Sequence, residues 1–219
     1  MEELPLAVQL TDQPCLCVGG GSVVARRLPP LLAAGARVTV IAPTLDPALI
    51  PLVASGRCTH AARHYRQGDC AGMYLVLAAT GLTEVDTVVA AEARTNRSLV
   101  CVASAPDLGN CLFMATVRRG ALVVAMHTGG SAPAVTGAVR RLIDAQLPEN
   151  LGKILDDLAE ARLELRKRQP DPAKRAACWR AVVESGALDR ALTSGTREAL
   201  DDVRRLLAGE QQSDQTPDT

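Results

Sequence analysis

The chain has 219 residues, and 47% of them are hydrophobic, which is enough for one large or two small folded domains. Lys plus Arg and Asp plus Glu both total 24, and aromatic residues make up only 2%, so the composition argues against a protein that binds nucleic acid or an anionic membrane. No apolar stretch reaches the ~18 residues of a membrane span. Seven cysteines without a CxxC pair indicate neither disulfides nor a zinc ribbon, so we expect a cytoplasmic protein.

The first half of the chain alternates predicted strands and helices. Strands are expected at 14–18, 37–41, 58–65, 73–79 and 99–103, and helices at 22–34 and 84–95. The strands are mostly continuous apolar runs, which is typical of a parallel sheet that helices cover on both faces. Pro29 and Pro30 fall inside the first helix, where we expect a kink or a break because proline removes a backbone donor.

Near Cys111 the strand–helix alternation stops. Two strand-like segments, 112–117 and 121–126, predict a hairpin, and a helix is expected at 133–147. After Pro148 all periodicity is helical. An apolar hairpin outside a completed core is usually buried against a partner, so we expect a homodimer built through this region.

A glycine-rich turn, Gly19-Gly20-Gly21-Ser22-Val23-Val24, joins the first strand to the first helix. Gly19 permits a tight turn, and Gly21 lets a pyrophosphate approach the backbone at the helix N-terminus, as in dinucleotide-binding sites. Val24 replaces the third glycine of that pattern, so an ordinary strand–helix turn is the alternative. No Asp or Glu ends the second strand, so backbone groups or Thr44 are expected to hold the ribose.

Two further segments are candidates for the site. Thr80 ends the fourth strand and is expected to line a cofactor cleft, with a plain strand end as the alternative. His127 precedes the small polar segment 128–133, whose free amides suit an anionic group. Simple capping of the next helix by Ser131 is the alternative.

Other histidines and cysteines have simpler interpretations. His60 and His64 have the spacing of a helical metal pair, but their segment is predicted as strand or loop, so we expect a solvated pair. Cys15 and Cys17 share one face of a strand and are expected to be core thiols rather than metal ligands. We therefore predict no metal site.

In this order, the motifs resemble the precorrin-2 dehydrogenase/sirohydrochlorin ferrochelatase family, the N-terminal module of siroheme synthase. The resemblance covers residues 1–205 and rests on segments 19–27, 38–43, 78–80, 102–106 and 128–133. It implies an α/β, Rossmann-like fold, an intertwined homodimer, and oxidation of precorrin-2 to sirohydrochlorin with NAD⁺; insertion of Fe²⁺ or Co²⁺ stays open. The expected organisation is an NAD-binding domain at 1–111, a dimerisation region at 112–147, a helical domain at 148–209 and a disordered tail at 210–219.

The resemblance also implies roles for individual residues. The cofactor would contact Gly19, Gly21, Ser22, Val23, Pro43, Thr44 and Thr80. Thr128 stands where the family has a serine, keeps the hydroxyl, and is expected to take part in catalysis. The carboxylates of the tetrapyrrole would meet arginines such as Arg118, Arg119 or Arg140, for which a solvated surface is the alternative. We expect NAD⁺ over NADP⁺, because no arginine stands at 42–44.

Ser104 is the main departure from the family, which has a catalytic aspartate at this position. A serine cannot accept a substrate proton near neutral pH without a base. We therefore expect the base to be His127, or else Asp107, with little cost on loss of the Ser104 hydroxyl and a gain in rate from Ser104→Asp. The alternatives are a protein that binds NAD or a tetrapyrrole without turnover, and a chelatase alone.

Overall fold

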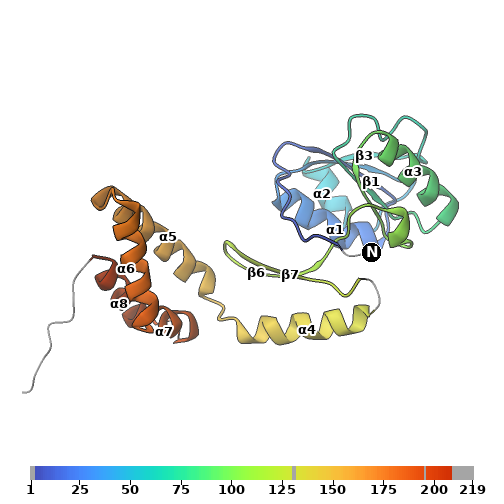
Figure 1. Cartoon of the computed structure of the whole chain (residues 1–219). Helices are drawn as coiled ribbons and strands as arrows, with labels where there is room; N and C mark the ends of the chain where they lie inside the picture. The colour runs from blue at the N-terminus through green and yellow to red at the C-terminus, as the bar shows by residue number, and fades with distance from the viewer. Residues whose placement is uncertain (1–2, 130–131, 195, 209–219) are drawn as a thin grey trace, which may run out of the picture. The chain divides into compact units, whose positions relative to one another are not determined.

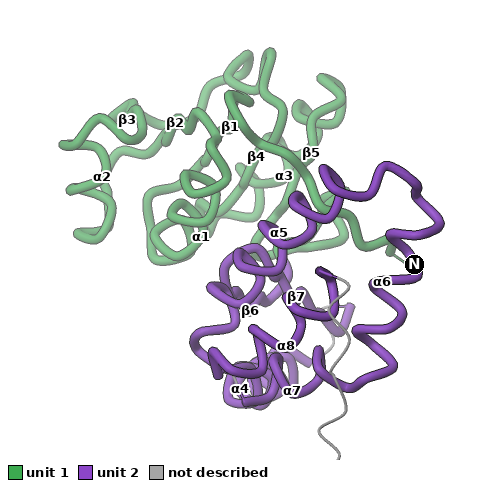
Figure 2. Tube along the Cα trace, turned by 90° about the vertical axis from the view of Figure 1, so that its left-hand side faces the viewer, with its two compact units in different colours: residues 1–113 green, residues 114–219 purple. Residues whose placement is uncertain are grey.

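The computed structural model describes residues 3–129, 132–194 and 196–208. The chain forms two compact units, residues 1–113 and 114–219, which Figure 2 shows in different colours. Ser131 and the predicted disordered tail at 210–219 lie outside the described residues.

Unit 1 (Figure 1) is built on a five-stranded parallel sheet, and its strand order β3-β2-β1-β4-β5 can be followed in Figure 2. Its strands are β1 (Pro14–Val18), β2 (Arg37–Ile41), β3 (Thr59–Ala61), β4 (Leu75–Ala78) and β5 (Leu99–Val102). Its helices are α1 (Ser22–Ala33), α2 (Ile50–Ala54), α3 (Thr83–Thr95) and the short 3₁₀ turn η1 (Pro106–Leu108). The strand order reverses between β1 and β4, and ligands of open α/β sheets bind at such a point, beyond the carboxyl ends of the strands.

The side chains of alternate strand residues belong to two hydrophobic cores, one on each face of the sheet. Cys15 and Cys17 of β1 pack with buried residues of α1, such as Leu28. Leu16 and Val18 belong to the opposite core, with buried residues of α3. The predicted parallel sheet covered on both faces is thus confirmed.

Helix α1 runs without interruption through Pro29 and Pro30, so the predicted break does not occur. Both prolines lie on the exposed side of the helix. The opposite side buries Val24, Leu28 and Leu31 against the sheet. Burying such side chains contributes roughly 1.5–3 kcal/mol each, which offsets the ~3 kcal/mol cost of an interior proline.

Unit 2 begins with the predicted hairpin, in which β6 (Ala115–Arg119) pairs with β7 (Leu122–Met126) in antiparallel register. It continues with α4 (Pro133–Gln146), α5 (Leu151–Arg168), α6 (Pro172–Glu184), α7 (Ala187–Ser194) and α8 (Arg197–Ala208). Residues of the last four helices form a separate core around Val182, Ala191 and Val203. Within the described part of the chain, no helix is long and apolar enough to cross a membrane.

Candidate functional site

A cavity of about 400 Å³ opens in unit 1 where the strand order reverses. The glycine turn and the segments that follow β2, β3 and β4 line it. Its lining residues include Gly19, Gly20, Gly21, Pro43, Thr44, Asp46, Arg63, Tyr65 and Thr80. The position and size of the cavity match those of ligand sites in sheets of this topology.

The glycine turn is shaped for close contact with a ligand. Gly19 has φ +115°, and a Cβ there would lie 2.2 Å from the carbonyl oxygen of Ala79. A Cβ on Gly20 would lie 2.1 Å from the carbonyl oxygen of Thr44. At Gly21, by contrast, no heavy atom of the described residues would come within 4 Å of a Cβ, so the space before α1 is open. The backbone N–H groups of the first turn of a helix have no intrahelical acceptors, and this turn therefore fits a dinucleotide phosphate.

Most of the residues that the sequence proposed for the cofactor lie in this cavity. Gly19, Gly21, Pro43, Thr44 and Thr80 line it. The other two predicted residues, at positions 22 and 23, are the first two of α1 and are not among its lining residues.

A carboxylate that the sequence analysis missed also lines the cavity. Asp46 lies past the end of β2 and is held there by a hydrogen bond from its N–H to the carbonyl oxygen of Gly20, 2.7 Å away. Its Oδ1 accepts the N–H of Ala48 at 2.9 Å. Asp46 therefore adds a carboxylate to the backbone groups and Thr44 that the sequence predicted for the ribose. The expected acidic residue does not stand at the end of β2, and the loop after β2 brings Asp46 into the cavity instead.

Arg63 also lines the cavity, but its guanidinium is already paired. Nη1 and Nη2 of Arg63 donate to the two carboxylate oxygens of Asp69, each at 2.7 Å. These hydrogen bonds are the main reason that the pKa of Asp69 lies below its usual range. The N–H of Arg66 also donates to Asp69, at 2.8 Å.

Glu92 of α3 holds the loop after β3, which contributes Tyr65 to the lining of the cavity. Its carboxylate accepts the Tyr65 hydroxyl at 2.6 Å and the backbone N–H groups of Gly68 and Cys70 at 3.0 and 2.9 Å. Burial acts to raise the pKa of Glu92, but these hydrogen bonds outweigh it and the pKa is lowered. The segment that presents Tyr65 to the cavity is therefore fixed by a charged group.

A buried carboxylate connects the carboxyl ends of β4 and β5. Asp86 of α3 is 0% exposed. Its Oδ1 accepts the N–H and the hydroxyl of Thr80 at 3.1 and 2.7 Å, and its Oδ2 accepts the Ser104 hydroxyl at 3.2 Å. Asp86 is not among the site residues predicted from the sequence. The available signal was an acidic residue at helical spacing from Val89, Ala90 and Ala93, which α3 buries.

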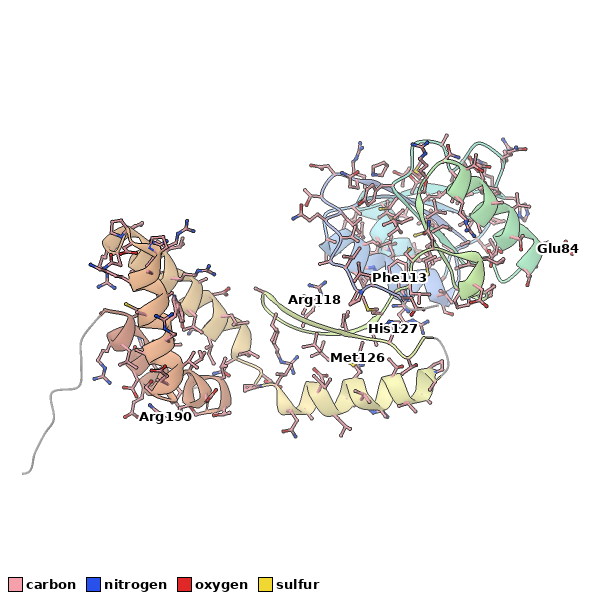
Figure 3. The ribbon with its side chains drawn as sticks, viewed as in Figure 1. Glu84, Phe113, Arg118, Met126, His127 and Arg190 are labelled. Carbon is pink, nitrogen blue, oxygen red and sulfur yellow. The ribbon has the colours of Figure 1, made fainter. Side chains whose placement is uncertain are left out.

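Of the other predicted catalytic residues, Asp107 belongs to unit 1, and His127 and Thr128 belong to unit 2. Asp107 is in η1, is exposed, and forms no ion pair with another described residue. His127 and Thr128 follow β7 in unit 2; His127 is labelled in Figure 3. Nδ1 of His127 accepts the N–H of Gly129 at 3.1 Å, which places the proton of a neutral imidazole on Nε2. The Thr128 hydroxyl accepts the N–H of Ala132 at 3.3 Å, at the start of α4.

Cys15, Cys17 and His60 of unit 1 serve the fold. Cys15 and Cys17 are buried in β1, and burial raises the pKa of Cys15 to about 11, so this thiol stays protonated near neutral pH. Nε2 of His60 lies 2.9 Å from the carbonyl oxygen of Ala42. No group of three or more potential metal ligands occurs among the described residues.

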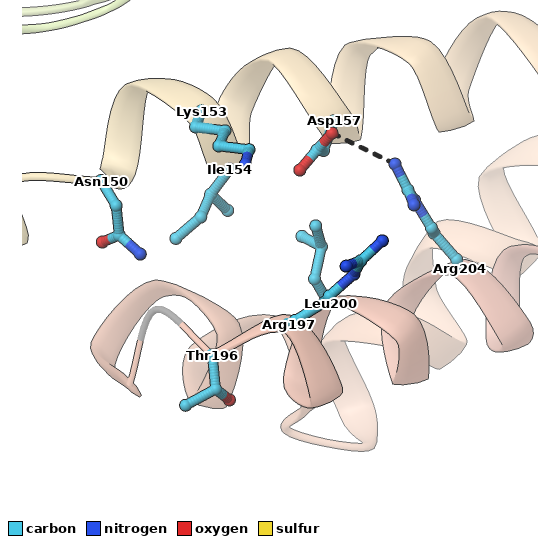
Figure 4. A pocket seen from close by; sticks show the side chains of 8 residues that line it. All are labelled: Asn150, Lys153, Ile154, Asp157, Thr196, Arg197, Leu200 and Arg204. Atoms are coloured by element: carbon cyan, nitrogen blue, oxygen red, sulfur yellow. Dashed lines mark hydrogen bonds and ion pairs between the residues drawn. The ribbon is translucent and has the colours of Figure 1, made fainter.

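A second cavity, of about 240 Å³, lies in unit 2 between α5 and α8 (Figure 4). Its lining residues include Asn150, Lys153, Asp157, Arg197 and Arg204, none of which the sequence proposed for a site. Nη2 of Arg204 pairs with Oδ1 of Asp157 at 3.2 Å, so part of the charge along its wall is already neutralised. The larger cavity in unit 1 is therefore the better candidate for a cofactor.

Comparison with known proteins places these features in a family. The family model described as putative NAD(P)-binding matches residues 6–115. The siroheme synthase of Methylobacillus flagellatus is 36% identical over 91% of this chain and 42% of its own length. Siroheme synthase 1 of Aeromonas hydrophila is 36% identical over 97% of this chain and 46% of its own length. The chain thus spans less than half the length of these relatives.

A solved structure supports the fold over nearly the whole chain. The protein named "SirC, precorrin-2 dehydrogenase" matches with a TM-score of 0.78 over 94% of this chain and 100% of its own, at 20% sequence identity. The family match covers the sheet, the glycine turn and the cavity of unit 1. This chain therefore belongs to the family described as putative NAD(P)-binding.

Proposed function

We propose that this chain is an NAD⁺-dependent dehydrogenase that oxidises precorrin-2 to sirohydrochlorin. The observation that carries the proposal is the cavity at the strand-order reversal, which fits a dinucleotide, in a chain similar to siroheme synthases over 91% of its length. When bound, the nicotinamide supplies the hydride acceptor. The chain itself must hold the phosphates at the glycine turn and accept the proton that the substrate also loses.

Anaerobic incubation with precorrin-2, with and without NAD⁺, tests the proposal. We expect NADH and the sirohydrochlorin spectrum only when NAD⁺ is present. A protein that binds NAD⁺ but forms no NADH from precorrin-2 would instead be a binding protein. Addition of Fe²⁺ or Co²⁺ to sirohydrochlorin without NAD⁺ tests metal insertion separately.

The polar residues of the cavity favour NAD⁺ over NADP⁺. The 2′-phosphate of NADP⁺ needs a free cation, and Arg63 is held by Asp69 in a bidentate pair. The Asp46 carboxylate in the same cavity would repel a phosphate and can accept a ribose hydroxyl. These charges support NAD⁺ as the cofactor.

In the Asp69→Asn variant, the ratio of the Kd for NADP⁺ to the Kd for NAD⁺ is expected to fall roughly tenfold. Loss of one charge-assisted hydrogen bond frees the Arg63 guanidinium for a phosphate. Calorimetric titration of wild type and variant with both dinucleotides measures the ratio. Glu84→Gln is the matched control: it changes an exposed carboxylate on α3 and should leave this ratio unchanged. Tighter binding of NADP⁺ than of NAD⁺ by the wild type would contradict the choice of cofactor.

Of the three arginines considered for the tetrapyrrole carboxylates, we favour Arg118. Arg119 pairs with Asp144 at 2.9 Å and also donates to the carbonyl oxygen of Leu147 at 3.3 Å, which commits it to the fold. Arg140 shares Asp144, at 3.7 Å. The exposed Arg118 on β6 (Figure 3) has no side-chain partner among the described residues and is available for a carboxylate.

We also propose that the chain forms a homodimer through residues 112–147. Val135, Val139 and Leu142 lie at helical spacing on one face of α4 and are 54%, 38% and 68% exposed. None of the residues of α4, all of which are described, is buried. A second copy of this chain would remove this apolar stripe from water.

Sedimentation is expected to show a dimer at micromolar concentration for the wild type and a monomer for Leu142→Glu, because a carboxylate in an apolar interface must be desolvated. Leu163→Glu on α5 is the matched control: this leucine is 58% exposed and lies outside residues 112–147. A monomeric wild type would rule out the dimer.

A further inference from the structure

Ser104 stands at the position where the family resemblance implies an aspartate. In the structure, the carboxylate of another residue, Asp86, forms a hydrogen bond with the Ser104 hydroxyl. Asp86 lies on α3, and its Oδ2 accepts the Ser104 hydroxyl at 3.2 Å. Ser104 is exposed at the carboxyl end of β5, whereas Asp86 is wholly buried. Thr80, held by the other oxygen of Asp86, lines the cofactor cavity. The three side chains thus connect the cavity to the neighbouring strand end.

Asp86 is wholly buried in the first turn of α3, and no cation accompanies its carboxyl group among the described residues. Among the described residues its partners are the N–H and hydroxyl of Thr80 and the hydroxyl of Ser104, and no Lys, Arg or His pairs with it. An asparagine could accept from Thr80 with its amide oxygen and donate to Ser104 with its amide nitrogen, without a buried charge. A buried carboxylate without a cation is unfavourable for stability, and such groups are concentrated at functional sites.

We propose that Asp86 is a positioning residue that acts through Ser104 and supplies the carboxylate that position 104 lacks. This inference rests on the proposed oxidation of precorrin-2. Dehydrogenation removes a hydride, which the nicotinamide takes, and a proton. The Ser104 oxygen forms a bond to that proton as the substrate's bond to it breaks. At the same time the hydroxyl proton of Ser104 moves along the 3.2 Å hydrogen bond to Oδ2 of Asp86.

Proton balance is restored after the product leaves. Asp86 returns a proton to the Ser104 oxygen, and the exposed hydroxyl releases the extra proton to solvent. Ser104 by itself is too weak a base for this step, and Asp86 by itself is too deeply buried to touch a substrate. The pair replaces His127 and Asp107 as our choice, because Asp107 is not in the cluster and Nδ1 of His127 already accepts the N–H of Gly129.

Asp86→Asn tests the inference, because it keeps the shape and removes the proton acceptor. We expect kcat for precorrin-2 oxidation to fall about 100-fold or more, while KM for precorrin-2 and Kd for NAD⁺ stay within about twofold of wild type. Ser104→Ala, at an exposed position, is expected to lower kcat similarly without affecting folding. Glu84→Gln on the same helix (Figure 3) is the matched control and should keep the wild-type kcat.

The decisive variant is the double substitution Asp86→Asn with Ser104→Asp, which moves the carboxylate to position 104. We expect it to recover at least tenfold in kcat over Asp86→Asn, which a purely structural role of Asp86 would not produce. Absence of this recovery, or a wild-type kcat for Ser104→Ala, overturns the inference while the proposed function stands. A wild type that forms no NADH from precorrin-2 refutes the proposed function itself, and the inference with it.

Discussion

Replacing Gly19 with alanine is expected to lower the free energy of unfolding by about 2–6 kcal/mol and to abolish cofactor binding. At φ +115° an L-residue is strained, and the new Cβ would lie 2.2 Å from the carbonyl oxygen of Ala79 and 2.7 Å from its carbon. The backbone of Ala79 cannot easily move away from the new Cβ, because its N–H donates to the carbonyl oxygen of Val18 at 2.9 Å. The strain therefore acts on the pairing of β1 with β4, at the floor of the cavity.

Gly21→Ala is expected to weaken NAD⁺ binding without a large change in folding stability. Since no described heavy atom would lie within 4 Å of its Cβ, we expect the free energy of unfolding to change by less than about 1 kcal/mol. NAD⁺ affinity should nevertheless fall at least tenfold, because the methyl group would fill the space before α1 that a phosphate needs. Guanidinium unfolding and calorimetric titration of the two variants measure both effects. Wild-type stability of Gly19→Ala would contradict the steric account.

The sheet and most of its helices could be predicted because their signals are local. β1 and β4 are continuous apolar runs, and β2 alternates around β-branched residues, so each strand is recognisable by itself. The glycine turn between β1 and α1 is likewise a contiguous motif. Of the kink or break predicted at Pro29 and Pro30, the break is wrong, because the burial of Leu28 and Leu31 on the other side of α1 stabilises the helix beyond its local propensity.

Contacts between distant segments could not be predicted in this way. The register of β4 with β5 pairs Ala78 with Val102, and this brings Thr80 and Ser104, which follow these strands, to the same buried carboxylate. The Arg63–Asp69 pair depends on the folding of the loop after β3. Neither arrangement has a periodicity or spacing that the sequence alone exhibits.

Asp86 reverses one expectation about the chemistry. From the sequence, Ser104→Asp restores a family carboxylate and should raise the rate. In the structure, the Ser104 hydroxyl oxygen is 3.2 Å from Oδ2 of Asp86, so the substitution places two carboxylates against each other. Like charges at this distance cannot both be ionised without a large penalty.

The single variant Ser104→Asp is therefore expected to be less stable than wild type by about 3 kcal/mol at pH 7, because the new carboxylate would face the buried carboxylate of Asp86. The sign of the pH dependence follows from proton uptake: the folded pair retains a proton that the unfolded chain releases above about pH 4. The difference in free energy of unfolding between wild type and Ser104→Asp should thus grow as the pH rises from 4 to 7, and it should shrink as the pH falls.

Guanidinium unfolding of wild type and Ser104→Asp at several pH values measures this deficit. Addition of Asp86→Asn should abolish most of it, because the second charge is then absent and an amide can donate to the new carboxylate. If Ser104→Asp alone is as stable as wild type from pH 4 to 7, the new carboxylate must turn away from Asp86 into solvent. In that case the hydrogen bond between Ser104 and Asp86 would not constrain position 104, and the gain in rate expected from the sequence alone would again apply.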